Sequence, residues 1–590
     1  MDPDPDVQMP PEEEDLENWG NGVDVSNRER DPRSSYTAFG ERARKVIPGE
    51  SQCKMFCGGK QCKYCTTEHW KPEQMVIPGV YSEWVTDNIL AMARLSNANI
   101  EKYQMIKSFK EHSVKTVINL QQPGEHAHCG FGNDESGFSY SPQILMENKV
   151  YFYNFALMDY GVASVSTLLS IVKVMQFSLS SGKVAVHCHA GLGRTGLIIA
   201  CFLIFNNRVS AQKAVQYVRS RRPGSIQTRK QLKTCYMFER EIKIYFIIFP
   251  SKVEGAMPLT FSKSLKRQTE ILHGYEARKL KHIPKVIYVC CERLLELCGR
   301  GGSLSNLRNK PIEPTPPDLE SLAGCSTSRD LPDSLGNSLG LGDSQDFLGS
   351  SSASFSNGEM LNQQANSSSN DGEDDDEKLE NGDVGSGEEG GVNTSQQDLA
   401  GMDYTRQESS TLCEAKFTVQ ELCDKIVDMD KSKRTTEINS KVDALEELLN
   451  KKDKAWQDLA REDNPEVVCG VLFDWIDQLS EPILTSQDIL LLLKDNSTDL
   501  GKILLHLHRS LKHFLEYIIL VLSKFQPLEQ KTTDKLLELF LCKLCQKKLN
   551  IGFLKRSMYE QSLHAMEAKD LFIIFERLLD TQKGIPLVSS

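Results

Sequence analysis

The 590-residue chain lacks any apolar run long enough to cross a bilayer. Its longest runs, such as residues 244–249, are far short of the roughly 20 residues that a membrane-spanning helix needs. Residues 1–21 have neither a basic start nor an apolar core, so we expect no secretory or mitochondrial leader. Without such a leader, an odd number of cysteines, 17, indicates reduced thiols rather than a disulfide framework. These absences predict a cytoplasmic protein with no transmembrane segment.

Excess positive charge is also absent, because the formal net charge is −12 at pH 7. This balance argues against general nucleic-acid binding. Two long tracts have too few apolar residues to form a core: the acidic N-terminus, residues 1–50, and a tract rich in serine, glycine, asparagine and acidic residues, 299–411. We expect both to be disordered, the second as a linker, which leaves two folded units.

One segment carries a recognisable chemistry. The apolar residues 184–186 predict a buried strand and residues 197–204 predict a buried helix, and the sequence between and around them, 187–196, is HCHAGLGRTG. A glycine-rich turn between a strand and a helix directs backbone N–H groups and the positive end of the helix dipole at one point, which is a site for phosphate. The same field favours the thiolate form of Cys188, a competent nucleophile.

The other residues of this segment suit phosphoryl transfer. Arg194 can bind two phosphate oxygens through its planar guanidinium, and the hydroxyl of Thr195 can donate to the sulfur when it leaves. The substrate cradle is expected to consist of the loop between them, namely His189, Ala190, Gly191, Leu192 and Gly193. The alternative, a buried cysteine before an arginine that caps a helix or forms an ion pair, leaves the glycines unexplained.

The segment resembles the signature loop of the cysteine-dependent protein tyrosine and dual-specificity phosphatases, and is most similar to the mitotic-exit dual-specificity type. The resemblance covers about residues 75–250 and implies a cysteinyl-phosphate mechanism on a phosphoprotein substrate, with no cofactor required. Relatives of the mitotic-exit type also suggest a centrosomal or ciliary location. Alternating strands and helices in this range independently predict an α/β domain with a central sheet flanked by helices.

The resemblance implies further site residues. The general acid falls on Asp159, in a loop after the apolar strand expected over 150–158, although no Trp-Pro pair precedes it as it does in the family. The alternative role of Asp159 is a turn or helix N-cap. Residues 221–231 resemble the family's glutamine loop, in which Gln227 would orient the attacking water and Gln231 would support the substrate. Their alternative is an exposed polar helix face.

Two features favour a dual-specificity protein phosphatase over its relatives. No Asn-Arg-Tyr loop precedes the catalytic region, as a strict tyrosine phosphatase would require. His189 stands where close relatives often carry lysine, which makes the pocket less cationic than that of phosphoinositide phosphatases. Two alternatives remain open: a phosphoprotein-binding scaffold without turnover, and a phosphoinositide phosphatase.

A second cluster lies in the Cys-rich segment 51–74. Its four thiols, Cys53, Cys57, Cys62 and Cys65, could bind one tetrahedral zinc ion. The alternatives are reduced thiols that pack beside the catalytic domain and a redox partner for Cys188.

Two regions follow the phosphatase domain. Residues 251–298 form a basic and then amphipathic extension that could dock a partner, cover the phosphatase domain or present a solvated face. Residues 412–585 have the leucine periodicity of an all-α domain, for which we expect a protein partner.

Overall fold

The computed structural model describes residues 47, 49–159, 161–301, 304, 307, 316, 415–429, 434–494, 500–554, 559 and 561–583. Most of the acidic N-terminal segment and of the linker expected over 299–411 lies outside these residues. The predictions of disorder for these two tracts therefore stay predictions.

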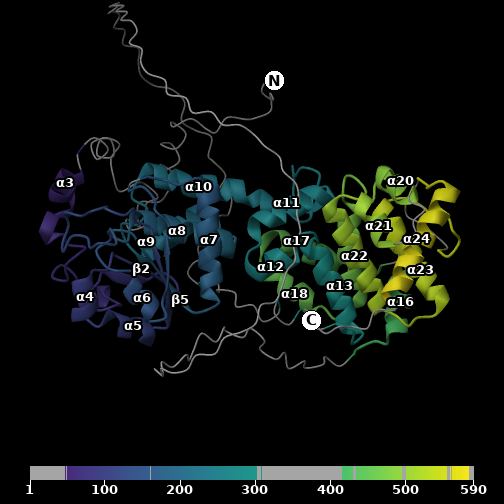
Figure 1. The fold of residues 1–590 in the computed structure, drawn as a ribbon, viewed down its shortest axis with the longest axis horizontal. Coiled ribbons are helices and arrows are strands. Elements are labelled where there is room, and N and C mark those ends of the chain that lie inside the picture. The colour runs from purple at the N-terminus through teal and green to yellow at the C-terminus, as the bar shows by residue number, and fades with distance from the viewer. Residues whose placement is uncertain are drawn as a thin grey trace, which may run out of the picture. The chain divides into compact units, whose positions relative to one another are not determined.

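A five-stranded mixed sheet forms the centre of the first folded part (Figure 1). The strand order is β1-β2-β5-β3-β4; β1 pairs antiparallel with β2 and the other pairs are parallel. β5 lies in the middle and is almost fully buried, as the run Val184–Val186 predicts. The strand bounds are β1 Ser82–Trp84, β2 Ile89–Met92, β3 Val114–Asn119, β4 Tyr151–Asn154 and β5 Lys183–His187.

Helices cover both faces of this sheet. Successive side chains of β5 point to opposite faces, so the strand contributes to a hydrophobic cluster on each face. Val184 and Val186 belong to a hydrophobic cluster with α7, α8, α9 and α10, whereas Ala185 belongs to a cluster with α4, α5 and α6. The α/β architecture expected from the sequence is confirmed. The helix bounds are α3 Gly49–Gln52, α4 Asn97–Lys102, α5 Met105–Glu111, α6 Gln143–Glu147, α7 Val165–Leu179, α8 Gly193–Asn207, α9 Ala211–Arg221 and α10 Arg229–Lys243.

Two expected elements differ from the structure. The sequence of residues 99–109 favours a helix with Asn99 as the candidate N-cap. The helix instead begins after Ser96, whose hydroxyl accepts from the Asn99 N–H at 3.2 Å, and it breaks at Gln104, where φ is +50°. The core strand expected before Asp159 is the short edge strand β4, and its side chains are only partly buried. An edge strand pairs with another strand on one side only. Its side chains can therefore be less buried than an aromatic-rich sequence suggests.

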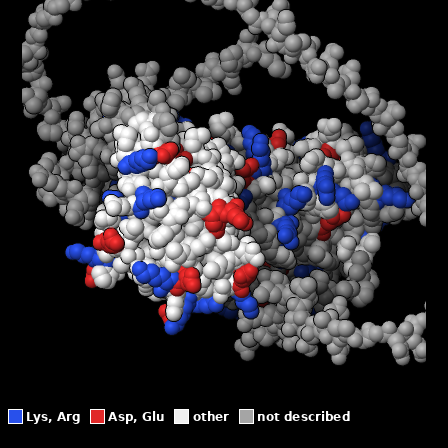
Figure 2. Space-filling model, turned by 60° about the vertical axis from the view of Figure 1, so that its left-hand side comes forward, with Lys and Arg blue, Asp and Glu red and all other residues white. Residues whose placement is uncertain are grey.

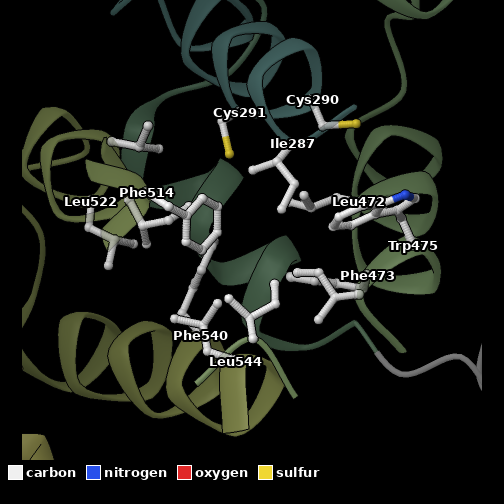
Figure 3. Close-up of a cluster of buried hydrophobic side chains, with 14 of the residues drawn as sticks. Ile287, Cys290, Cys291, Leu472, Phe473, Trp475, Phe514, Leu522, Phe540 and Leu544 are labelled. Atoms are coloured by element: carbon white, nitrogen blue, oxygen red, sulfur yellow. The ribbon is translucent and has the colours of Figure 1, made fainter. Parts of the chain in front are cut away.

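The second folded part is helical and includes most of the extension after the phosphatase domain. Residues of α13 are buried against α18, α19 and α22, and Figure 3 shows Ile287 and Cys291 of α13 in the same core as Trp475, Phe514 and Phe540. Its helices are α11 Phe261–Ile271, α12 Gly274–Lys279, α13 Lys285–Leu297, α16 Val419–Val427, α17 Thr436–Lys451, α18 Ala455–Arg461, α19 Pro465–Asp477, α20 Ser486–Lys494, α21 Leu500–Ile503, α22 Arg509–Lys524, α23 Gln530–Cys545 and α24 Ala565–Lys583.

The extension thus divides between two environments. Lys263 and Lys266 of α11 are exposed, as expected of a solvated basic face, but the amphipathic stretch 286–297 is core. Its apolar side meets the periodic leucines of the later helices, a long-range pairing that local periodicity does not specify.

Two surface properties complete the description. Among the described residues, no helix combines the length and the apolar character needed to cross a membrane. On the face shown in Figure 2, basic and acidic side chains are interspersed around a broad uncharged area.

Candidate active site

The segment 188–192 forms a tight loop between β5 and α8, and its carbonyl groups point away from the loop centre. The carbonyl of His189 accepts from the Arg94 N–H at 3.0 Å, and that of Leu192 accepts from the Ile226 N–H at 3.2 Å. The guanidinium of Arg222 donates to the carbonyl of Gly191 at 2.7 Å and to that of Ala190 at 3.4 Å. Because the carbonyls are held by surrounding residues, the loop N–H groups are left for a ligand.

The N–H groups of residues 189–193 donate no hydrogen bond to any other described residue. Within the same range of description, the buried Thr195 Oγ1 and Arg194 Nε also have no partner. Buried donors are normally satisfied, so several of them beside the nearly buried Cys188 (4% exposed) indicate a site for an anion.

Gly191 is essential to this geometry. Its φ is +66°, and a Cβ at this position would lie 2.0 Å from the Met92 carbonyl oxygen on the adjacent strand. Only glycine allows the loop to pass so close to β2.

Arg194 is almost fully buried and is held by backbone and carboxylate groups. Its Nη1 donates to Glu125 Oε2 at 2.7 Å and to the Leu157 carbonyl at 2.9 Å, and its Nη2 contacts the other oxygen of Glu125. Nη2 also lies 2.9 Å from Asp159 Oδ1. Glu125 thus holds the Nη1–Nη2 edge, and the edge formed by Nε and Nη2 faces Asp159.

Asp159 lies beside the loop as the sequence predicts, and it has two cationic neighbours. His126 Nε2 is 3.2 Å from its Oδ2, and Arg194 contacts its Oδ1. Burial alone raises the pKa of Asp159, but the charge of Arg194 and the hydrogen bond with His126 outweigh burial and lower this pKa well below its usual range.

His187 orders the start of the loop. Its Nδ1 lies 3.1 Å from the Cys188 carbonyl and its Nε2 lies 2.7 Å from the Tyr140 hydroxyl. Burial lowers the pKa of His187 to about 4, so the ring is neutral near pH 7. Because a carbonyl can only accept, Nδ1 carries the proton and Tyr140 donates to Nε2.

The side chains of Gln227 and Gln231 both approach the signature loop at Gly193. A Cβ on Gly193 would lie 3.0 Å from Gln227 Oε1 and 3.1 Å from Gln231 Nε2. Gln231 Oε1 accepts from the N–H groups of Gln227 and Thr228 and so caps α10. The side-chain oxygen of Gln231 is therefore occupied by these two N–H groups, whereas the side chain of Gln227 remains available to bind a water.

The four cysteines of the Cys-rich segment also come together, and three residues from elsewhere join them. Cys129 and His126 follow β3, and His189 belongs to the signature loop. His189 was expected in the substrate pocket; its Nε2 lies 3.6 Å from Cys62 Sγ and 3.8 Å from Cys65 Sγ, and its ring stacks on that of His126. The described cysteines, including these, are free thiols.

Sequence reasoning missed Glu125, His126, Cys129 and the role of Arg222. For the first three, a signal was present, because they follow β3 and the carboxyl ends of parallel strands share one edge of the sheet. Arg222 belongs to the segment 221–231 that resembles the glutamine loop; it is fully buried, and its hydrogen bonds hold the backbone of the signature loop. Nothing in the sequence distinguishes it from the adjacent arginine.

This fold and loop define a phosphatase domain. Residues 100–241 match the family model "Dual specificity phosphatase, catalytic domain", and the chain therefore contains a domain of that family. It is similar to "Protein tyrosine phosphatase domain-containing protein 1" of Bos taurus, with 49% identity over 293 residues, which cover 50% of this chain and 36% of that protein. The match thus spans about a third of that relative's length.

A second curated relative and one solved structure are also similar to parts of this chain. "Dual specificity protein phosphatase CDC14B" of Mus musculus is 49% identical over 121 residues, covering 20% of this chain and 21% of that protein. The crystal structure of kinase associated phosphatase, with its catalytic cysteine replaced by serine, is 18% identical and has a TM-score of 0.24, covering 28% of this chain and 95% of that one.

Proposed function

We propose that the chain is a protein phosphatase that hydrolyses phosphotyrosine, phosphoserine or phosphothreonine through a cysteinyl-phosphate on Cys188. The observation that carries the proposal is the set of donors around this sulfur that have no partner among the described residues: the N–H groups of residues 189–193 and the buried Arg194 Nε and Thr195 Oγ1. Such preorganised donors stabilise the charge on a transferred phosphoryl group without reorganising during the reaction.

The proposed binding step uses the guanidinium edge of Arg194 that is formed by Nε and Nη2 and faces Asp159. A phosphate that takes Nε and Nη2 as a bidentate pair replaces Asp159 at Nη2, whereas Glu125 keeps the opposite edge in place. Asp159, released from the arginine, is then adjacent to the bound group. Exchange of one anion for another keeps the buried guanidinium paired throughout.

The chemical steps use the residues that line this site. Phosphate binding removes the charge of Arg194 from Asp159, so the pKa of this buried carboxyl rises and it takes up a proton from solvent. The Cys188 thiolate then attacks phosphorus, the bond to the leaving oxygen breaks, and Asp159 protonates that oxygen as general acid. In the second step Gln227 orients a water, Asp159 accepts its proton, and Thr195 stabilises the departing sulfur. Gln231 acts by capping α10 and so by supporting the loop that carries Gln227.

The test compares the full chain with its Cys188→Ser variant on an aryl phosphate, phosphopeptides and phosphoinositides. Turnover of the aryl phosphate and phosphopeptides by the wild type, absent in the variant, is expected. If both proteins instead bind a phosphopeptide equally and neither hydrolyses it, the chain is a phosphoprotein-binding scaffold without catalytic activity. Turnover confined to phosphoinositides would establish the lipid phosphatase.

Location and partners rest on the sequence and on the family resemblance. A cytoplasmic protein at the centrosome or cilium, and a protein partner for the C-terminal helices, remain predictions. They can be examined by imaging the full chain and by cross-linking in cells.

A further inference from the structure

Seven metal-binding side chains gather on one side of the signature loop. Four lie in the Cys-rich segment, two follow β3 and one lies in the loop itself. The donor atoms of Cys57, His126, Cys129 and His189 all lie within 4.8 Å of one another, and so do those of Cys62, Cys65 and His189. Cys53 completes the set, since its sulfur lies 3.5 Å from His126 Nδ1.

We propose that this cluster binds zinc, and that the ion fixes the Cys-rich segment and His126 beside the catalytic loop. The proposal enlarges the four-cysteine site expected from the sequence by Cys129, His126 and His189. It does not depend on turnover by Cys188.

The distances agree with tetrahedral coordination. With Zn–S of about 2.3 Å and Zn–N of about 2.0–2.1 Å, a sulfur and a nitrogen ligand of one ion lie about 3.6 Å apart. His126 Nδ1 lies 3.5, 3.9 and 3.6 Å from the sulfurs of Cys53, Cys57 and Cys129. His189 Nε2 lies 3.6 and 3.8 Å from those of Cys62 and Cys65.

The number of ligands sets the stoichiometry. Two tetrahedral ions need eight ligand positions, which seven side chains supply when one thiolate bridges both ions. Cys57 and Cys129 suit the bridging role, because each lies close to both imidazoles. Thiolate and imidazole together select zinc over the harder cations that prefer oxygen.

The surroundings also suit a metal centre. Arg94 Nε donates to Cys65 Sγ at 3.3 Å and its Nη2 donates to the Cys129 carbonyl at 2.6 Å, which places a positive charge beside the thiolates. The Gly130 N–H donates to the Gly59 carbonyl at 3.0 Å and so joins the two cysteine-bearing loops. A Cβ on Gly130 would lie 2.4 Å from Cys65 Cβ, so glycine is required for this approach.

The ion would also act on the catalytic acid through His126. Nδ1 of this ring faces the sulfurs and Nε2 faces Asp159 at 3.2 Å. When Nδ1 is a ligand, the ring proton is on Nε2 and is donated to Asp159, as in other carboxylate–histidine–zinc arrangements. His126 is thus a positioning residue for Asp159.

The first test measures metal content in the full chain purified without chelators. Two equivalents of zinc are expected, and the same content is expected in Cys188→Ser, which separates this proposal from the proposed reaction. Cys129→Ser and His126→Gln should lower the content by about half or more. The matched controls are Cys235→Ser, a buried thiol outside the cluster, and His128→Gln, an exposed neighbour; both should retain wild-type zinc.

A second measurement needs no variant and therefore does not depend on the fold of one. Co²⁺ added to the metal-free chain should give thiolate-to-cobalt charge transfer and the visible bands of a tetrahedral ion. The proposal is overturned if the wild-type protein contains no zinc and its cobalt-treated form shows none of these bands. It is also overturned if the protein contains iron with inorganic sulfide, or if mass spectrometry maps disulfides within the cluster.

Discussion

Arg194 Nη2 lies 2.9 Å from Asp159 Oδ1, so the arginine expected to bind phosphate and the aspartate expected to protonate the leaving group are paired with each other in the free protein. Glu125 holds the other edge of the same guanidinium. The aspartate thus occupies the position that a substrate oxygen would take. In the proposed reaction, this one contact would couple substrate binding to proton transfer.

Asp159→Asn should separate these two roles. Loss of the general acid should lower kcat on a phosphopeptide by about 10²–10⁴-fold. Loss of the competing charge at Arg194 should at the same time tighten binding of inorganic phosphate, measured as a competitive inhibition constant. Asp87→Asn, at an exposed position, is the control. Weaker phosphate binding in Asp159→Asn would contradict the exchange.

Gln227→Ala should slow the second step more than the first. Without an oriented water, hydrolysis of the cysteinyl-phosphate should fall by about 10²-fold, and the phosphorylated protein should accumulate. Acid-quenched mass spectrometry would detect the added phosphate on Cys188. Lys233→Ala, on the same helix, provides the comparison. An unphosphorylated Cys188 during turnover of the Gln227 variant would show that this residue does not act in hydrolysis.

Arg222→Lys should impair the loop although it retains the charge. Lysine lacks the planar fork that holds the carbonyls of Gly191 and Ala190, so the loop should shift and kcat/KM should fall by about 10²-fold. Arg221→Lys, at the exposed neighbouring position, should retain activity. Equal activity of the two variants would mean that Arg222 contributes charge alone.

Two glycine variants can distinguish contact from backbone strain. Gly191 and Gly224 both have positive φ, but a Cβ meets the Met92 carbonyl oxygen at 2.0 Å in the first case and nothing within 4 Å in the second. Gly224→Ala should cost about 1–2 kcal/mol of stability and leave kcat/KM near the wild-type value. Gly191→Ala should lower kcat/KM by about 10²-fold or more. Thermal denaturation and steady-state kinetics test both, and similar kinetics in the two variants would contradict the close approach.

Glu446 of α17 should make the helical part sensitive to pH. Burial and the nearby charge of Asp474 raise its pKa to about 7, although Lys252 opposes this shift, and its Oε1 has no partner among the described residues. Because the folded pKa lies above the unfolded value, the stabilising contribution is present below about pH 4.5 and is lost as the pH rises through about 7.

Glu446→Gln should remove this dependence. Relative to the wild type, the variant should gain about 2 kcal/mol between pH 5.5 and pH 8, measured by hydrogen exchange of the α17 amides after correction for intrinsic rates. Glu447→Gln, an exposed neighbour that pairs with Lys451, is the control. Parallel pH profiles of the wild type and Glu446→Gln would exclude the buried carboxyl as the cause.

The central part of the fold and the core of the site could be predicted because their determinants are local. The run Val184–Val186 predicted the middle strand, and the apolar residues 197–204 predicted the buried helix α8. Cys188, Arg194 and Thr195 lie within a few residues of one another, so one strand-to-helix turn brings them together. Their functions depend on the backbone of that same turn.

Where prediction failed, the determinant was a distant neighbour. β4 is an edge strand because no strand pairs on its far side, and α13 is buried because helices more than a hundred residues later cover it. Neither fact is present in the local pattern of apolar residues.

By itself the sequence indicated the phosphatase class and predicted Cys188 as the nucleophile and Arg194 as the phosphate-binding residue, since a contiguous loop encodes all three. Only the tertiary structure decided that Glu125 pairs with Arg194, that Arg222 holds the loop, and that Cys129, His126 and His189 join the thiols of residues 53–65. Those contacts join segments tens of residues apart in the chain. The contacts between the loops after β3 and β5 form because these paired parallel strands end at a common edge of the sheet.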